Sequence, residues 1–192
     1  TPLADVAEGM RRLIEQGKVR ACGVSNFTVE QLAAARQFGP FAVAQPSYSL
    51  ANPAIERDLL PYCQAAGVGV MVYSPMHKGL LSGKYTGTET FTDFRRYHPD
   101  FQGERFRQLA GAVRGLQPLA DRYGMSLYQL VLAATLMHPS IDVAIVGVKN
   151  AAQIEAAAAV MGKQLERADC FAVRGALAPE TVKMRDAHGV VK

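Results

Sequence analysis

Long apolar stretches, paired cysteines and a strong excess of one charge are all missing from this 192-residue chain. No apolar run approaches the roughly 20 residues that a membrane-spanning helix needs, so we expect no membrane partner. The first residues, Thr1 and Pro2, form a helix-start signal rather than a signal peptide. The sequence therefore predicts an intracellular protein with a sizeable core.

The charge balance excludes one class of partner. Twenty-one basic residues against 17 acidic ones give a net charge of +4, and the excess is scattered along the chain. A nucleic-acid-binding domain usually gathers its basic residues in a patch or stripe, so no nucleic-acid partner is expected. The isoelectric point near 9.0 suits a small anionic ligand, although a solvated basic surface is the commoner explanation.

Residues that could bind a metal are few and badly spaced. The three cysteines are odd in number and lie far apart without a C-x-x-C pair, which argues against a disulfide framework or a zinc site and fits a reducing cytoplasm. The four histidines also lack metal-ligand spacing with cysteines or acidic clusters. No metal site is predicted among these residues: Cys22, Cys63, Cys170, His77, His98, His138 and His188.

Helix and strand signals alternate along the chain. Two capping boxes, Thr28 to Gln31 and Ser126 to Gln129, mark helix starts, and Asn150 with Gln153 marks a third. The expected strands are 19–24, 41–45, 68–73 and 143–146. The expected helices are 1–17, 28–39, 52–67, 107–123, 126–138, one from 150 and one beyond 163.

Four apolar strands separated by helices favour an α/β fold with a parallel sheet covered by helices on both faces. Four strand–helix units also amount to half of an eight-stranded barrel, which typically takes about 250 residues. We therefore predict one partial TIM-barrel domain over residues 1–192. Residues 76–106 break the rhythm with glycines, aromatics and arginines, and so long an excursion is more often a functional flap than structural filler.

Polar residues stand at the end of every predicted strand. In parallel α/β folds this edge is where ligands bind, because loops and helix N-termini converge there. An aromatic ring, amide and hydroxyl groups and one lysine together fit a nucleotide pocket. These residues are Ser25, Asn26, Gln45, Tyr73, Ser74, Pro75, Gly147, Lys149 and Asn150.

Five blocks of sequence resemble the aldo-keto reductase family, in the family's order and spacing from residue 1 to about residue 165. The blocks are 17–27, 45–50, 60–63, 73–85 and 145–150. Residues 93–103 are similar to the bacterial branch related to potassium-channel β-subunits and general stress proteins. The resemblance implies the carboxyl-terminal half of a (β/α)8 barrel, from helix 4 through strand and helix 8 plus a terminal helix.

The resemblance also implies a role for the residues at the first three strand ends. Ser25, Asn26 and Gln45 would hydrogen-bond the nicotinamide carboxamide, which offers both donor and acceptor faces. Tyr73 would lie flat against the nicotinamide ring. Two simpler interpretations stay open: Ser25 and Asn26 only make the turn before the next helix, or Tyr73 is a core aromatic.

Further implied contacts concern the rest of an NADPH molecule. Backbone groups of Ser74, Pro75, Met76 and the stretch from Gly79 to Gly83 would wrap the pyrophosphate, unless these glycines only make a flexible loop. At the last strand, Gly147 precedes Lys149 and Asn150, which would hold the adenosine 2′-phosphate, with Gln153 near adenine. Ala156 and Ala157 depart from the family pattern. Arg95 and Arg96 would fold onto the phosphates or stay solvated.

The family reduces aldehydes and ketones with an Asp, Tyr, Lys and His set carried on its first four strands. None of Tyr48, Tyr62, His77 or His98 matches a position of that set, so we assign no catalytic residue. The resemblance implies the NADPH-binding half of a carbonyl reductase acting on a small-molecule carbonyl substrate. The alternative is a non-catalytic module that associates with itself or with a separate amino-terminal half.

Overall fold

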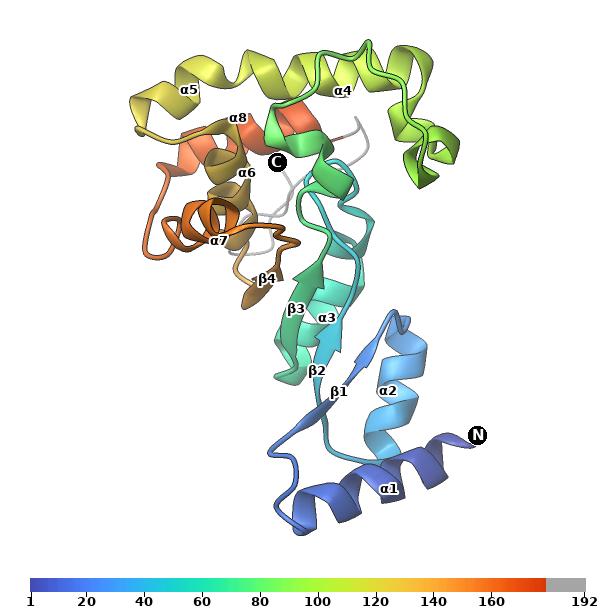
Figure 1. The fold of residues 1–192 in the computed structure, drawn as a ribbon. Coiled ribbons are helices and arrows are strands. Elements are labelled where there is room, and N and C mark those ends of the chain that lie inside the picture. The colour runs from blue at the N-terminus through green and yellow to red at the C-terminus, as the bar shows by residue number, and fades with distance from the viewer. Residues whose placement is uncertain (179–192) are drawn as a thin grey trace.

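A computed structural model of the chain describes residues 1–178. Its central element is a four-stranded parallel sheet in the order β1-β2-β3-β4, as Figure 1 shows. The strands are β1 (Cys22–Ser25), β2 (Phe41–Gln45), β3 (Gly69–Tyr73) and β4 (Val143–Ile145). All four expected strands are therefore confirmed, each within a few residues of its predicted range.

Within residues 1–178, eight α-helices connect and cover these strands. They are α1 (Leu3–Glu15), α2 (Val29–Phe38), α3 (Leu59–Ala66), α4 (Gly103–Gly115), α5 (Gln117–Arg122), α6 (Leu127–Leu136), α7 (Ala151–Ala158) and α8 (Arg167–Leu177). Both predicted capping boxes are present: Thr28 opens α2 and Ser126 opens α6, each with the reciprocal glutamine contact. Asn150 caps α7 as expected.

Two expected helices are wrong in their extent. The helix predicted over 52–67 is a short 3₁₀ turn, η1 (Ala54–Glu56), followed by α3. Asp58 starts α3 because its carboxylate accepts a hydrogen bond from the Leu59 amide at 2.6 Å. The helix predicted over 107–123 begins earlier, at Gly103, and divides into α4 and α5 just before Pro118, whose ring fits a helix start better than an interior.

The sheet has one covered face, which corrects the expectation of helices on both faces. Val70 and Val72 of β3 are 1% and 0% exposed. Met71 and Tyr73 point the other way and pair with Val143 and Ile145, which are 41% and 37% exposed. The second face is therefore half open, as the inner face of an incomplete barrel would be.

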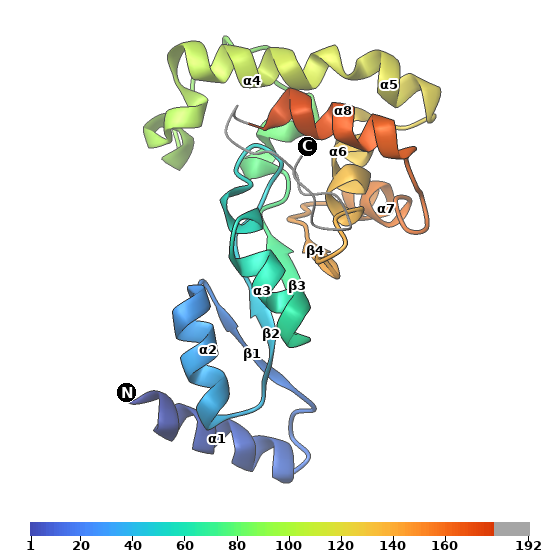
Figure 2. The ribbon, with the colours of Figure 1, turned by 180° about the vertical axis from the view of Figure 1, so that it is seen from behind.

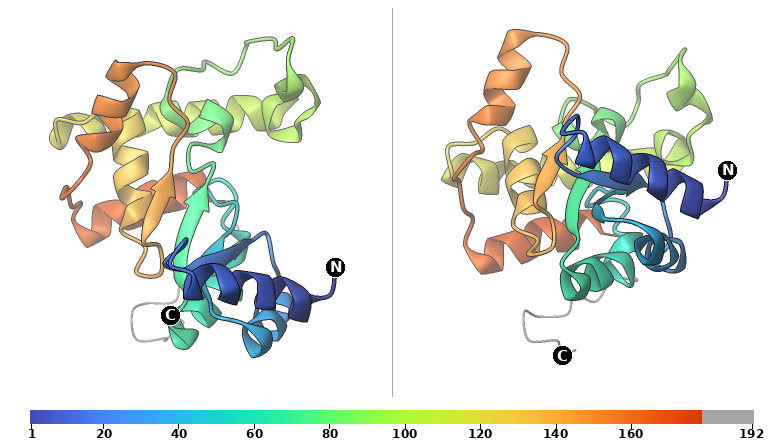
Figure 3. Two further views of the ribbon diagram at one scale, coloured as in Figure 1. Left: turned by 60° about the horizontal axis from the view of Figure 1, so that its bottom comes forward. Right: turned by 90° about the horizontal axis from the view of Figure 1, so that it is seen from below.

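The molecule is extended rather than round. α4 and α5 run end to end across one extremity, while α1 and α2 lie at the other beside β1 (Figures 1 and 2). With the α1 end tilted forward, the sheet is seen between these two groups of helices (Figure 3, left). The amino-terminal group has a small core of its own, made by Ala7, Ala35 and Phe41.

The long excursion after β3 is built from short turns. They are η2 (His77–Ser82), η3 (Phe94–Tyr97) and η4 (Pro99–Phe101). Three aromatic rings, Phe91, Phe101 and Phe106, pack edge-to-face around Tyr85 and join the segment to the main hydrophobic core. The segment is thus folded against α4, and it supplies one wall of the cleft described next.

Candidate functional site

The polar residues that end the first three strands come together at one edge of the sheet. Ser25 pairs with Gln45 in the β1–β2 register, and its hydroxyl donates to the Gln45 carbonyl oxygen at 2.9 Å. The Tyr73 hydroxyl donates to the Asn26 Oδ1 atom at 3.0 Å. We call Ser25, Asn26, Gln45 and Tyr73 the strand-edge group.

The backbone explains why Asn26 reaches this position. Asn26 has a φ of 59°, in the left-handed region that asparagine adopts more easily than most residues. Its amide donates to the Gln45 carbonyl at 3.3 Å, which ends β1, and Thr28 starts α2 two residues later. The turn before α2 and the contact with Tyr73 are therefore formed by the same residue.

A cleft of about 900 Å³ begins at Ser74, directly after the strand-edge group. Its walls come from the turn after β3, from η3, from the start of α6 and from the segment between β4 and α7. Of the predicted site residues it is lined by Ser74, Pro75, Met76, Gly79, Arg95, Gly147, Lys149, Asn150 and Gln153. Segments that lie far apart in the sequence thus meet in one cavity.

The cleft is strongly cationic. Lys78, Lys84, Arg95 and Lys149 line it, and the acidic side chain among its lining residues is Asp93. The Arg95 Nε atom donates to Asp93 at 2.9 Å, and this hydrogen bond, with help from Lys149, lowers the pKa of Asp93 to about 2. Because the cations outnumber this carboxylate, the cleft suits a ligand with several negative charges.

The start of α7 adds to this preference. The Asn150 Oδ1 atom accepts a hydrogen bond from the Gln153 amide at 3.0 Å, and the Gln153 Oε1 atom accepts from the Lys149 amide at 2.7 Å. These two contacts hold Lys149 beside the helix N-terminus, whose dipole also favours an anion. A phosphate group is the natural ligand for such an arrangement.

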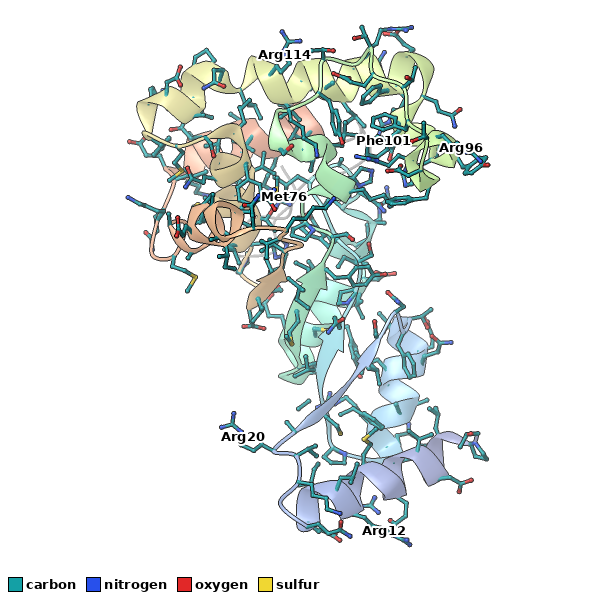
Figure 4. All side chains as sticks on the ribbon, viewed as in Figure 1. Arg12, Arg20, Met76, Arg96, Phe101 and Arg114 are labelled. Atoms are coloured by element: carbon teal, nitrogen blue, oxygen red, sulfur yellow. The ribbon has the colours of Figure 1, made fainter. Side chains whose placement is uncertain are left out.

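The strand-edge group itself does not line the cleft, and two further predicted residues, Gly83 and Arg96, belong to neither region. Gly83 has a φ of 81°, and a Cβ atom there would lie 2.5 Å from a methyl carbon of Leu127. Its glycine is therefore required for packing against α6, and it does not line the cleft. Arg96 stacks on Tyr97, with its guanidinium 4.4 Å from the ring centre. Figure 4 labels Arg96 at the protruding end of the excursion, in η3.

The sequence prediction missed several residues that line the cleft: Lys78, Lys84, Asp93, Phe94, Ser126, Tyr128, Val146, Ala152 and Ala156. Lys78 and Lys84 lie inside the sequence block 73–85, so their charge was the available signal. Asp93 and Phe94 begin the family-like stretch 93–103, but only the folding of residues 76–106 brings η3 over the cleft.

The fold gathers one cluster that spacing did not reveal. His77, His98 and Asp100 place ligand-type atoms within 4.8 Å of one another. The His77 Nε2 atom lies 2.8 Å from Asp100, while Arg105 donates to the same carboxylate at 2.9 Å and Lys78 lies 3.2 Å from His98 Nε2. Two neighbouring cations oppose a metal ion there. His188 lies outside the described residues.

The cysteines and helices add two plain findings. Cys22, Cys63 and Cys170 are all free thiols. Among residues 1–178, no helix has both the length and the apolar character required to cross a membrane.

Comparison with known proteins decides the family. Residues 1–177 match the Aldo/keto reductase family. The chain belongs to this family. It is 37% identical over 171 residues to the aldo-keto reductase YhdN of Bacillus subtilis, covering 88% of this chain and 52% of YhdN. The resemblance stated from the sequence blocks is thereby confirmed.

Other relatives extend this picture. The NADH-specific methylglyoxal reductase of Escherichia coli is 30% identical over 91% of this chain and 53% of its own length. A probable voltage-gated potassium channel subunit beta of Arabidopsis thaliana is 29% identical over 81% and 51%. The chain therefore spans about half the length of the curated relatives it matches.

A solved structure confirms the fold class. The glycerol dehydrogenase AKR11B4 from Gluconobacter oxydans superposes with a TM-score of 0.86 at 32% identity, covering 92% of this chain and 54% of that one. The four parallel strands and their helices therefore correspond to about half of an aldo-keto reductase barrel, as predicted.

Proposed function

We propose that this chain supplies the dinucleotide-binding half of an NADPH-dependent reductase of aldehydes and ketones. The observation that carries the proposal is that the strand-edge group and the cationic cleft adjoin each other. Tyr73 belongs to the strand-edge group, and the next residue, Ser74, begins the cationic cleft. One elongated ligand with an amide-bearing ring at one end and phosphates at the other fits both parts.

The residues fit the cofactor piece by piece. Asn26, Ser25 and Gln45 offer amide and hydroxyl groups at the edge where a carboxamide would bind, and the Tyr73 ring is half exposed beside them. Ser74 to Gly79 and Arg95 would face the pyrophosphate. Lys149 and Asn150 at the start of α7 would hold the 2′-phosphate. Bound nicotinamide supplies the hydride; the chain's own residues bind and orient it.

The choice of NADPH over NADH rests on Lys149 and on the surplus of cations in the cleft. The relative named as NADH-specific makes this a choice worth testing directly. A fluorescence titration with each nucleotide provides the test. We expect NADPH to bind more tightly than NADH and both to bind weakly, because half of a pocket is poorly preorganised. Submicromolar binding, or a preference for NADH, would contradict this proposal.

We assign no catalytic residue to this chain. The proton-donating set of the family is implied to lie on the half of the barrel that residues 1–192 do not cover. Without general-acid assistance, reduction loses a factor of about 10²–10⁴. The purified chain should therefore not oxidise NADPH in the presence of a reactive aldehyde such as nitrobenzaldehyde. Robust turnover by pure material would refute this assignment.

The half-open sheet face favours a second candidate function, a module that associates. Val143 and Ile145 expose apolar surface on that face, and β1 and β4 each have one neighbour in the described sheet. Unpaired strand edges promote association. Two copies, or this chain and a separate amino-terminal half, would cover them. Size-exclusion chromatography with light scattering tests this: a stable, well-behaved monomer would oppose both assemblies.

A further inference from the structure

His77 is a buried side chain in the turn after β3, between Met76 and Lys78, which line the cleft. Its Nε2 atom donates to Asp100 of η4 at 2.8 Å, and its Nδ1 atom lies 3.1 Å from the hydroxyl of Ser49, a residue 1% exposed in the loop after β2. Its ring is parallel to Phe101, 8° apart in plane. His77 thus joins three segments that are distant in the sequence.

The backbone at this position is unusual. His77, Lys78 and Gly79 have φ values of 47°, 57° and 90°, three consecutive residues in the left-handed region. That region is disfavoured for residues with a Cβ atom, and such a run persists only where its surroundings enforce it. The ring contacts of His77 tie this turn to Ser49 and Asp100, and backbone hydrogen bonds from the Gly79 and Leu81 amides to the Met76 carbonyl close it locally.

The residues on both sides of His77 line the cleft, while His77 itself does not. Met76 and Lys78 face the cavity, and the Lys78 ammonium lies 3.2 Å from the Nε2 atom of His98, which precedes η4. Figure 4 shows Met76 near the centre of the molecule and Phe101 on the projection beyond it. A displacement of the His77 backbone would therefore displace both Met76 and Lys78 in the cleft.

We infer that His77 is a positioning residue, which holds the phosphate-facing turn 76–83 against η4 and so sets the shape of the cleft. The identity of the ligand in this inference rests on the proposed cofactor function. The role of His77 in holding the turn does not depend on any ligand. Asp100 is in turn held by Arg105 through a 2.9 Å hydrogen bond. We call the series of side-chain contacts from Ser49 through His77 and Asp100 to Arg105 the His77 latch.

The latch interpretation can be tested without any ligand, by hydrogen exchange of the backbone amides. In His77→Ala we expect the amides of residues 76–83 to exchange at least about tenfold faster, the loss that follows removal of one charge-assisted hydrogen bond. The amides of β2 and β3 should keep their wild-type rates. His77→Gln, which retains a donor for Asp100, should restore part of the protection.

Matched variants keep this test decisive. Tyr97→Ala alters an exposed residue of the same excursion and should leave residues 76–83 unchanged. If His77→Ala does not fold, Ser49→Ala removes one contact of the ring and provides the same comparison. Unchanged exchange at 76–83, or equal acceleration throughout the chain, would overturn the latch. Stabilisation of the wild type by added Zn²⁺ would overturn it too, because it would show these side chains acting as metal ligands.

Nucleotide binding then separates the latch from the proposed function. We expect His77→Ala to bind NADPH and adenosine 2′,5′-bisphosphate at least about tenfold more weakly than wild type, with His77→Gln in between. If the wild type binds neither nucleotide, the cofactor proposal fails, while the exchange data still decide whether His77 holds the turn. Wild-type affinity in His77→Ala would overturn its positioning role.

Discussion

The strand-edge group and the cationic cleft are neighbours, but they are built by different means. Ser25, Gln45 and Tyr73 are placed by strand pairing, so their positions follow from the register of β1, β2 and β3. The cleft is placed by turns and by side-chain contacts such as the His77 latch. A site fixed by sheet register should be rigid, whereas one fixed by turns should respond to pH and to single substitutions.

The largest expected effect comes from a substitution in β1, the strand that carries Ser25 of the strand-edge group. A Cβ atom on Gly23 would lie 2.3 Å from the Val43 carbonyl oxygen, inside the β1–β2 pairing. We expect Gly23→Ala to lower the free energy of unfolding by about 3 kcal/mol or more, because both atoms belong to paired strands and cannot move apart. Denaturant unfolding measures it.

Gly111→Ala is the matched control for that substitution. Gly111 lies within α4, and a Cβ atom added there would meet nothing within 4 Å, so alanine should stabilise the helix by about 0.5–1 kcal/mol. If Gly23→Ala changed the free energy of unfolding by no more than about 1 kcal/mol, as expected in size for Gly111→Ala, the strand register would not be rigid.

The second prediction separates the two regions by ligand. Lys149→Ala should weaken binding of adenosine 2′,5′-bisphosphate about tenfold and leave reduced nicotinamide mononucleotide unaffected. Tyr73→Ala should do the reverse, weakening the mononucleotide about fivefold through lost ring stacking. Isothermal titration calorimetry compares both. Equal losses for both ligands in either variant would contradict the division into two regions.

The third prediction uses pH. Burial lowers the pKa of His77 and, together with Lys78, that of His98, so folding favours the neutral form of both rings behind the cleft wall. Below the ordinary histidine pKa near 6.5 the unfolded chain binds more protons than the folded one. Local stability of the cleft should therefore fall as pH drops from about 7 towards 5.

Exchange rates compared between the two regions measure this effect. Residues 76–83 should lose several-fold more protection than residues 41–45 when the pH is lowered. His138, whose pKa burial lowers to about 4, also destabilises the whole fold at low pH. That contribution acts on both regions alike, so the difference between them is the informative quantity. Equal loss in both regions would argue against pH sensitivity of the cleft.

The smallest expected effect concerns Tyr128, which lines the cleft. Its hydroxyl is buried and, among the described residues, has no hydrogen-bond partner. Tyr128→Phe should therefore raise stability by up to about 1 kcal/mol. Tyr48→Phe is the contrasting control, because the Tyr48 hydroxyl donates to Glu56 at 2.6 Å and its loss should destabilise the chain. Thermal unfolding distinguishes them.

The sequence predicted the strand-edge group better than the cleft, for a physical reason. Periodicity and capping boxes locate strand ends, and parallel strand ends must meet, so Asn26 and Tyr73 could be placed together in advance. Asp93 and Lys78 meet the other residues of the cleft only through the folding of the excursion 76–106, which has no helix or strand period. Gly83 packs against Leu127 instead of lining the cleft, and the sequence alone does not distinguish a glycine that approaches a ligand from one that packs under a leucine.

The same reasoning explains the errors in the fold. The helix predicted over 52–67 is divided because Asp58 caps the start of α3. Asp58 is a possible N-cap in the sequence, but Pro53 is the stronger helix-start signal. The half-open face of the sheet could not be read from the strands, since apolar residues such as Val143 and Ile145 also suit a fully covered sheet.

The most direct test of the central claim, that one dinucleotide spans both regions, is an NMR titration of the ¹⁵N-labelled chain with NADPH. Amide signals of Asn26 and Gln45 should shift together with those of Gly79 and Lys149, and all four should saturate at one ligand concentration. Shifts confined to one region, or saturation of the two regions at different concentrations, would contradict the account.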